Sequence, residues 1–148
     1  MITEYRLKAP HHTAPFTIEV EYLPEAEIEE IVKELLWDYQ QLYVPGVEQE
    51  LNTDEYKKCC EQSELAWSTL EAAFGDRTEF RKELLRDNSD GAKERALALL
   101  LQWTQELDWP EGGSDGKWGS TAQDAEECCE KTGKFMENRL WPFTKVVW

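Results

Sequence analysis

The sequence predicts an α+β fold that is mostly α, in which a small antiparallel sheet carries a helical insertion of four to five helices. Three observations lead to this class. Apolar and polar residues alternate strictly from Phe16 to Tyr22, as they do in a half-buried strand. From Ile28 onward, apolar residues recur every three or four positions, which is the helical period. The final residues, 142–148, return to a β-prone composition.

The sheet is expected to contain two N-terminal strands and the C-terminal strand. Residues 1–23 are predicted to form a β-hairpin, with the basic residues of the first strand opposite Glu19 and Glu21. Residues 142–148 supply the terminal strand. A length of 148 residues favours one core, so we interpret residues 1–148 as a single domain.

The helical insertion is predicted to span residues 24–141. Five segments have helical periodicity, and turn residues separate them. They begin after Pro24, at the predicted N-cap Thr53, near Thr78, after residues 88–90, and near Thr121, with the last segment ending near Leu140. Glu111–Gly119 contains four glycines and is predicted to be an exposed loop.

The composition excludes several functional classes. There are 16 Lys+Arg against 31 Asp+Glu, and the net charge of −15 argues against nucleic acids or anionic membranes as partners. No apolar run approaches the ~20 residues of a membrane span, and the first six residues lack the apolar core of a signal peptide. We therefore expect an intracellular protein, cytoplasmic or nuclear, whose partner has a basic surface.

Two motifs invite a chemical interpretation that their spacing does not support. The cysteines form adjacent pairs, Cys59-Cys60 and Cys128-Cys129, and neighbouring helical residues diverge by about 100°, which is unfavourable for chelating one ion. Reduced structural thiols are favoured over a shared metal site that includes His11 and His12. Residues 112–118 resemble a phosphate-binding loop but have Trp118 where a Ser or Thr is required. We expect no metal ion and no cofactor for this chain.

The negative charge is concentrated in one part of the chain. Residues 19–64 contain 3 Lys+Arg and 14 Asp+Glu, which gives a local net charge of −11. This segment is either a set of solvated helix faces or a docking surface for a basic segment. The candidate docking residues are Glu25, Glu27, Glu29, Glu30, Glu34 and Asp38.

Short phrases in the sequence resemble a known family. Residues 2–6, followed by residues 16–23 entering an acidic helix, resemble the stretch after switch I in dynamin-like large GTPases, most closely the fungal relatives of the nuclear GTPase SLIP-GC. Residues 135–147 resemble the approach to the next core strands, just before the Asp-x-x-Gly motif of that family. Nearly the whole chain then corresponds to the interval between these two motifs.

The resemblance implies GTP hydrolysis with magnesium for a longer parent protein. The phosphate-binding loop, the Asp-x-x-Gly motif and the guanine-reading motif of the family do not occur in these 148 residues. We therefore expect part of a GTPase domain that is catalytically silent by itself and acts as an interaction surface, toward the remainder of a parent GTPase or by self-association. The alternative is an autonomous acidic interaction module that binds a basic protein.

Overall fold

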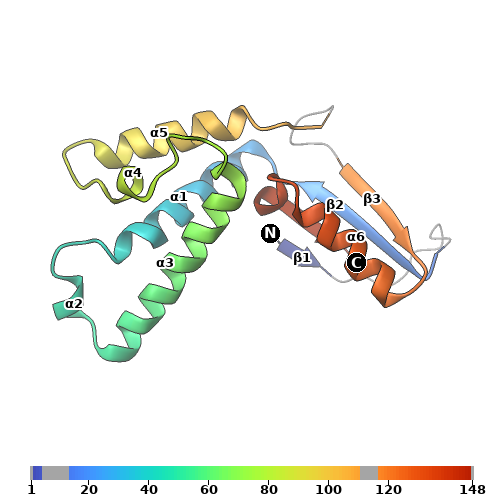
Figure 1. Cartoon of the computed structure of the whole chain (residues 1–148), viewed down its shortest axis with the longest axis horizontal. Helices are drawn as coiled ribbons and strands as arrows, with labels where there is room; N and C mark the ends of the chain where they lie inside the picture. Colours follow the sequence, from blue (N-terminus) through green and yellow to red (C-terminus); the bar gives the residue numbers. More distant parts are fainter. Residues whose placement is uncertain (1, 5–13, 111–116, 148) are drawn as a thin grey trace. The chain divides into compact units, whose positions relative to one another are not determined.

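A computed structural model of the chain describes residues 2–4, 14–110 and 117–147 (Figure 1). Its helical and strand content confirms the predicted α+β class, mostly α. The chain divides into two compact units: Met1–Ile28 with Asp108–Trp148, and Glu29–Leu107. We refer to them as the sheet unit and the helical unit. The helical unit is shorter than the predicted insertion at 24–141, because residues 24–28 and 108–141 belong to the sheet unit.

Among the described residues, the sheet unit contains one four-stranded sheet with its strands in the order β1-β4-β2-β3. Strand β2 pairs in antiparallel orientation with β3 and with β4, whereas β1 pairs with β4 in parallel. Helix α6 and the short 3-10 helix η2 complete the unit. The bounds are β1 (Ile2–Glu4), β2 (Phe16–Tyr22), β3 (Lys117–Ala122), α6 (Ala125–Met136), η2 (Trp141–Phe143) and β4 (Thr144–Val147).

The predicted hairpin of residues 1–23 is wrong in its pairing. Strand β2 has a neighbour on each edge: Glu19 is opposite Val147 of β4, and Phe16 is opposite Ala122 of β3. Both edges of β2 are therefore occupied, and β1 pairs instead with β4, in a register that places Ile2 opposite Lys145. The basic residues that were expected to face β2, Arg6 and Lys8, lie outside the described residues.

Two predictions between residues 111 and 140 also need correction. The loop expected at Glu111–Gly119 overlaps β3, because Trp118 is in register with the buried Val20 and the sheet extends the backbone there. The helix expected from Thr121 begins only at Ala125, since Thr121 belongs to β3. Its N-cap is Asp124, whose side chain accepts a hydrogen bond of 2.8 Å from the Glu127 amide.

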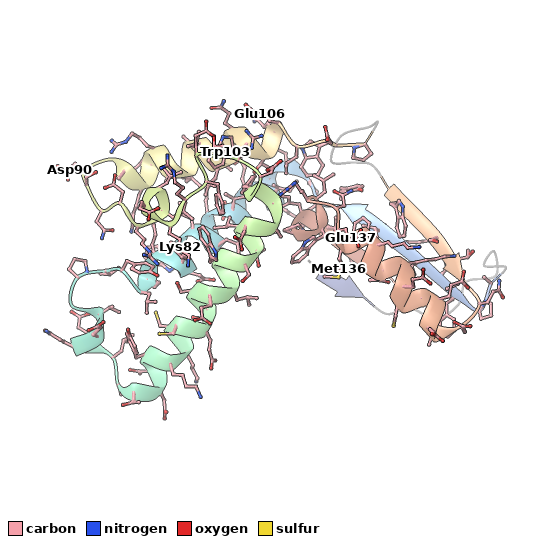
Figure 2. All side chains as sticks on the ribbon, viewed as in Figure 1. Lys82, Asp90, Trp103, Glu106, Met136 and Glu137 are labelled. Carbon is pink, nitrogen blue, oxygen red and sulfur yellow. The ribbon has the colours of Figure 1, made fainter. Side chains whose placement is uncertain are left out.

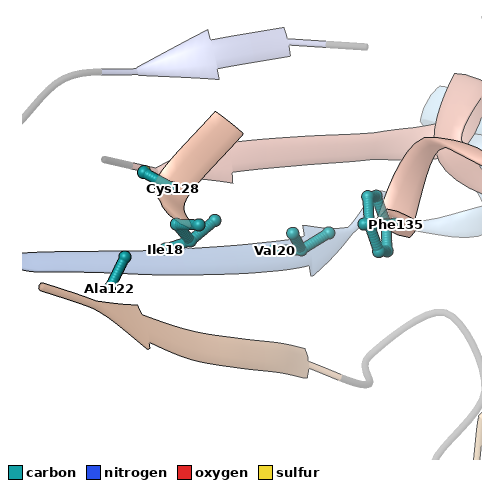
Figure 3. Close-up of a cluster of buried hydrophobic side chains, with 5 residues drawn as sticks. All are labelled: Ile18, Val20, Ala122, Cys128 and Phe135. Atoms are coloured by element: carbon teal, nitrogen blue, oxygen red, sulfur yellow. The ribbon is translucent and has the colours of Figure 1, made fainter. Parts of the chain in front are cut away.

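The core of the sheet unit lies between the sheet and α6 (Figure 3). Ile18 and Val20 point from β2 toward α6, as the alternation of the sequence predicts. Cys128 and Phe135 of α6 cover them, and Ala122 of the adjacent strand β3 belongs to the same buried cluster. Burial of one such apolar side chain stabilises the fold by about 1.5–3 kcal/mol.

The helical unit contains helix α1 from Glu29 onward and four further helices. Helix α2 was not predicted, because four residues are too few to show a helical period. The short helix expected at 78–86 begins later, at Lys82. The helices are α1 (Glu25–Gln41), α2 (Val47–Glu50), α3 (Thr53–Phe74), α4 (Lys82–Arg86) and α5 (Ala92–Gln105).

The N-cap of α3 is Asn52 and not the predicted Thr53. The Asn52 side chain accepts hydrogen bonds from the amides of Asp54 and Glu55, and the Glu55 carboxylate accepts one from the Asn52 amide. This capping box requires a Glu or Gln three residues after the cap, which Asn52 has in Glu55, whereas Thr53 would have Tyr56.

Aromatic residues fill the interior of the helical unit. Trp67 of α3 stacks on Phe80 with ring centroids 4.8 Å apart, and the ring of Phe74 lies 5.9 Å from that of Trp103 of α5. Figure 2 labels Trp103 among the side chains of this unit. Phe74 and Trp103 are buried, so these contacts join α3 and α5 within one core. Among the described residues, no helix is long and apolar enough to cross a bilayer.

Candidate functional site

Helix α1 has one acidic face, and its position follows from the helical period. Val32, Leu36 and Tyr39 are buried and define the inner side of the helix. Residues spaced three, four and four positions apart lie on the opposite side. This α1 acidic face consists of Glu27, Glu30, Glu34 and Asp38.

The structure thus brings together four of the six candidate docking residues. Glu25 and Glu29 are separated from the α1 acidic face, because helical rotation turns them toward the side of the helix that bears Val32. Glu27, Glu30 and Glu34 are exposed and Asp38 is half-buried, while of the two separated residues Glu29 is half-buried and Glu25, in the first turn, is exposed. The sequence identified the acidic segment, and the helical register selects the residues that share a face.

The α1 acidic face is largely without countercharge. Lys33 Nζ lies 3.2 Å from Glu30 Oε1, and both side chains are substantially exposed, so this pair contributes little to stability. Within the part of the chain that the structure describes, Glu27 and Glu34 form no ion pair. Such carboxylates attract a cationic partner over a distance of about one Debye length, ~8 Å at physiological ionic strength.

A shallow groove lies beside this face, between α1 and α5, with a volume of about 160 Å³. Leu36 and Trp37 line it from α1, and Lys93 and Leu97 from α5. The Trp37 side chain is 59% exposed, and the Lys93 ammonium lies 5.3 Å from the centre of its ring. Sequence reasoning missed Trp37. The signal was present, since Trp37 interrupts the polar side of α1, three residues after Glu34.

A second cluster of polar side chains has a structural role. Arg86 donates hydrogen bonds from Nε to the Tyr39 hydroxyl (2.9 Å) and from Nη2 to the Tyr43 hydroxyl (2.8 Å), and its guanidinium also lies over the Tyr43 ring. Burial raises the pKa of Tyr39 to about 12, so its phenol is neutral in the physiological range. The cluster joins α1 to α4, and the Tyr39 phenol is not poised for acid–base catalysis near pH 7.

The cysteines are all free thiols, and they differ in burial. Cys128 is buried and Cys129 is exposed, while Cys59 and Cys60 are half-buried. Burial raises the pKa of the Cys59 thiol, and the neighbouring Cys60 and Asp38 raise it further. Burial likewise raises the pKa of Cys128. A raised pKa favours the thiol over the nucleophilic thiolate, so neither residue resembles a reactive cysteine.

The metal site and the phosphate-binding loop that the sequence suggested form no site among the described residues. Among the described residues, no group of three or more His, Cys, Asp or Glu is arranged to hold a metal ion. His11 and His12 lie outside the described residues, as does most of the glycine-rich segment 112–118. Comparisons with protein-family models, curated proteins and solved structures give no match. A functional proposal therefore depends on the surface that the chain itself presents.

Proposed function

We propose that this chain is a non-catalytic protein-interaction domain whose α1 acidic face binds a basic segment of a partner protein. One observation carries the proposal: Glu27, Glu30 and Glu34 are exposed on one side of a helix, which the half-buried Asp38 continues, and Lys33 is the ion-pair partner of one of them. The net charge of −15 adds a long-range attraction for cations.

Electrostatics favours a basic protein segment over other classes of partner. An acidic surface repels nucleic acids and anionic membranes. Exposed ion pairs each contribute only about 0.2–1 kcal/mol, so several must form together for a useful affinity. Four carboxylates along three turns of α1 can pair with a basic segment of similar length, and the same charges accelerate association.

The proposal is tested by measuring the affinity of a fluorescently labelled basic peptide by anisotropy at low salt. The combined substitution Glu27→Gln, Glu30→Gln and Glu34→Gln should weaken binding about tenfold, since it removes three surface ion pairs. A matched control replaces three exposed glutamates of α3: Glu61→Gln, Glu64→Gln and Glu71→Gln. The control should change the affinity less than threefold, within the range of unspecific charge effects. Equal losses in both variants would contradict a site on α1.

A second candidate is that the chain forms part of a dynamin-like GTPase domain. It is supported by the pairing of β4 with both β1 and β2, because all three strands lie within the phrases that resemble this family. Glu19 and Val147 are direct neighbours in the sheet, although the whole helical unit separates them in the sequence. Neighbouring strands of one sheet with an insertion between them would be arranged in this way, and here the intervening segment also includes β3, which pairs with the other edge of β2.

This candidate also predicts a silent chain. GTP and magnesium would bind only in a longer parent that contains the nucleotide-binding motifs, because the 148 residues contain none of them. Calorimetric titration of this chain with GTP and Mg²⁺ should show no saturable heat. A micromolar dissociation constant would contradict the non-catalytic assignment.

A further inference from the structure

We infer that Trp37 is the anchor of the interaction surface, and that it receives an arginine side chain of the partner, which displaces Lys93 from the indole ring. This inference rests on the proposed function and adds to it the residue type that the surface recognises. It starts from a difference between Trp37 and the other aromatic rings that carry a cation.

Four cations lie over aromatic rings in the described residues. In three of these contacts the ring belongs to the core of the helical unit, being buried or half-buried; the pairs are Arg77 with Trp103, Lys82 with Trp67, and Arg86 with Tyr43. The fourth pair is Lys93 with Trp37, whose side chain is 59% exposed. An exposed tryptophan that already attracts a cation is the type of residue that dominates binding energies at interfaces.

Lys93 is also held more weakly than the two arginines over core rings. Arg77 forms an ion pair of 2.7 Å with Glu106, and Arg86 donates hydrogen bonds to two tyrosine hydroxyls. Within the described ranges, Lys93 forms no hydrogen bond or ion pair, and its ammonium lies over the Trp37 ring. An exposed cation–π contact is weak. A cation from a partner can therefore replace Lys93 at small cost.

The groove beside Trp37 has the size and chemistry of a site for one side chain. Its volume of about 160 Å³ is small and can hold the end of one long side chain. Leu36 and Leu97 provide apolar surface for an aliphatic stem. Glu94 also lines the groove, and Glu34 lies one turn before Trp37 on α1, so carboxylates are available for the charged end.

Arginine fits this site better than lysine. Its guanidinium is planar and weakly hydrated, so it stacks on an indole ring while its edge still donates to carboxylates. Lys33 and Lys93 also line the groove, and they would favour an acidic segment instead. Lys33, however, is already paired with Glu30, and the net charge of the chain is −15. The charge balance therefore favours a cation.

The test compares two peptides of equal length and charge, one with arginine and one with lysine at every basic position, by calorimetry against the full chain. The wild type should prefer the arginine peptide about three- to tenfold, the range that a cation–π contact with a partly desolvated ring provides. Trp37→Leu should abolish the preference, and Trp37→Phe should retain part of it. Because Trp37 is exposed, both variants should melt within a few degrees of the wild type.

Removal of the competing lysine gives a second readout. Lys93→Met should raise the affinity for the arginine peptide about threefold more than the control Lys57→Met, which removes an exposed lysine of α3. If both peptides bind equally well and Trp37→Leu does not change their affinity, Trp37 is not the anchor. The acidic face could still bind them, so the proposed function would stand. Absence of binding by either peptide would overturn the proposed function and this inference together. Preference for an acidic peptide would show that the groove binds through its lysines, and this result would also overturn the inference that it receives an arginine.

Discussion

The buried Tyr39 makes the stability of the helical unit sensitive to alkaline pH. Its side chain is 2% exposed, and burial raises its pKa to about 12, against about 10 in an unfolded chain. The hydrogen bond from Arg86 acts in the opposite direction and does not offset the burial. The folded state therefore holds the phenol proton more tightly than the unfolded state does.

Because the pKa of Tyr39 is higher in the folded than in the unfolded state, its contribution to stability is lost at alkaline pH. The contribution of Tyr39 is fully present below pH ~10 and is lost as the pH rises from ~10 toward 12, because the unfolded chain releases the proton first. Urea unfolding of the wild type should give a free energy that falls over this range. Tyr39→Phe, which has no proton to release, should fall less steeply. Equal slopes in both proteins would contradict the prediction.

Gln40 provides a second test at the level of one residue. Its side chain is buried, and Nε2 donates a hydrogen bond of 3.0 Å to the carbonyl oxygen of Leu85, which links α1 to α4. Gln40→Ala leaves that carbonyl without this donor, so the free energy of unfolding should fall by about 1–3 kcal/mol. The neighbouring Gln41→Ala, at a half-buried position, should change it by less than about 0.5 kcal/mol. Chemical denaturation measures the free energy of unfolding of the two variants. Similar losses in both would refute the role of this hydrogen bond.

At the level of elements, the N-terminus of α3 can be tested directly. Asn52→Ala removes an acceptor for two amide hydrogen bonds and should cost about 1 kcal/mol. Asn52→Asp keeps the acceptor and should be nearly neutral. Thr53→Ala lies one residue inside the helix and should have a small effect. A larger loss for Thr53→Ala than for Asn52→Ala, measured by thermal unfolding, would instead favour Thr53 as the cap.

The elements that the sequence predicted well are those whose signal is local. Alternation at Phe16–Tyr22 and the helical period of α1, α3 and α5 record which side of each element is buried. The pairing of β1 with β4 was missed because it joins residues at opposite ends of the chain, and no local pattern encodes a partner so distant. Strand β3 was missed for a related reason, since its glycine and polar residues become extended only beside β2.

The candidate surface was partly predictable in the same sense. The charge count identified six acidic residues, but it does not tell on which side of the helix each one lies. Helical geometry was needed to place Glu29 and Glu30 on different sides of α1. Trp37 was missed because tryptophan in a helix is ordinarily assigned to the core. Its place opposite Val32 and Tyr39 on α1 is what reveals an exposed aromatic residue.

At the level of the whole molecule, net charge should control stability and binding in opposite directions. The charge of −15 makes the surface carboxylates repel one another, and this repulsion opposes the compact state. Added salt shortens the Debye length from ~30 Å at 0.01 M to ~8 Å at 0.15 M. The repulsion then weakens, and the melting temperature should rise when sodium chloride is added over this range.

The same screening should weaken the attraction between the α1 acidic face and a basic peptide, so that affinity falls while the melting temperature rises. The two triple Glu→Gln variants, on α1 and on α3, each lower the magnitude of the net charge from 15 to 12, and both should show a smaller rise in melting temperature with salt. For binding they should differ, because the α1 variant alone should lose most of its salt dependence. Calorimetric melting and peptide titration across the same salt series measure both quantities. A melting temperature that falls with salt would show that favourable ion pairs outweigh the repulsion, and a salt-independent affinity would exclude an electrostatic site on α1.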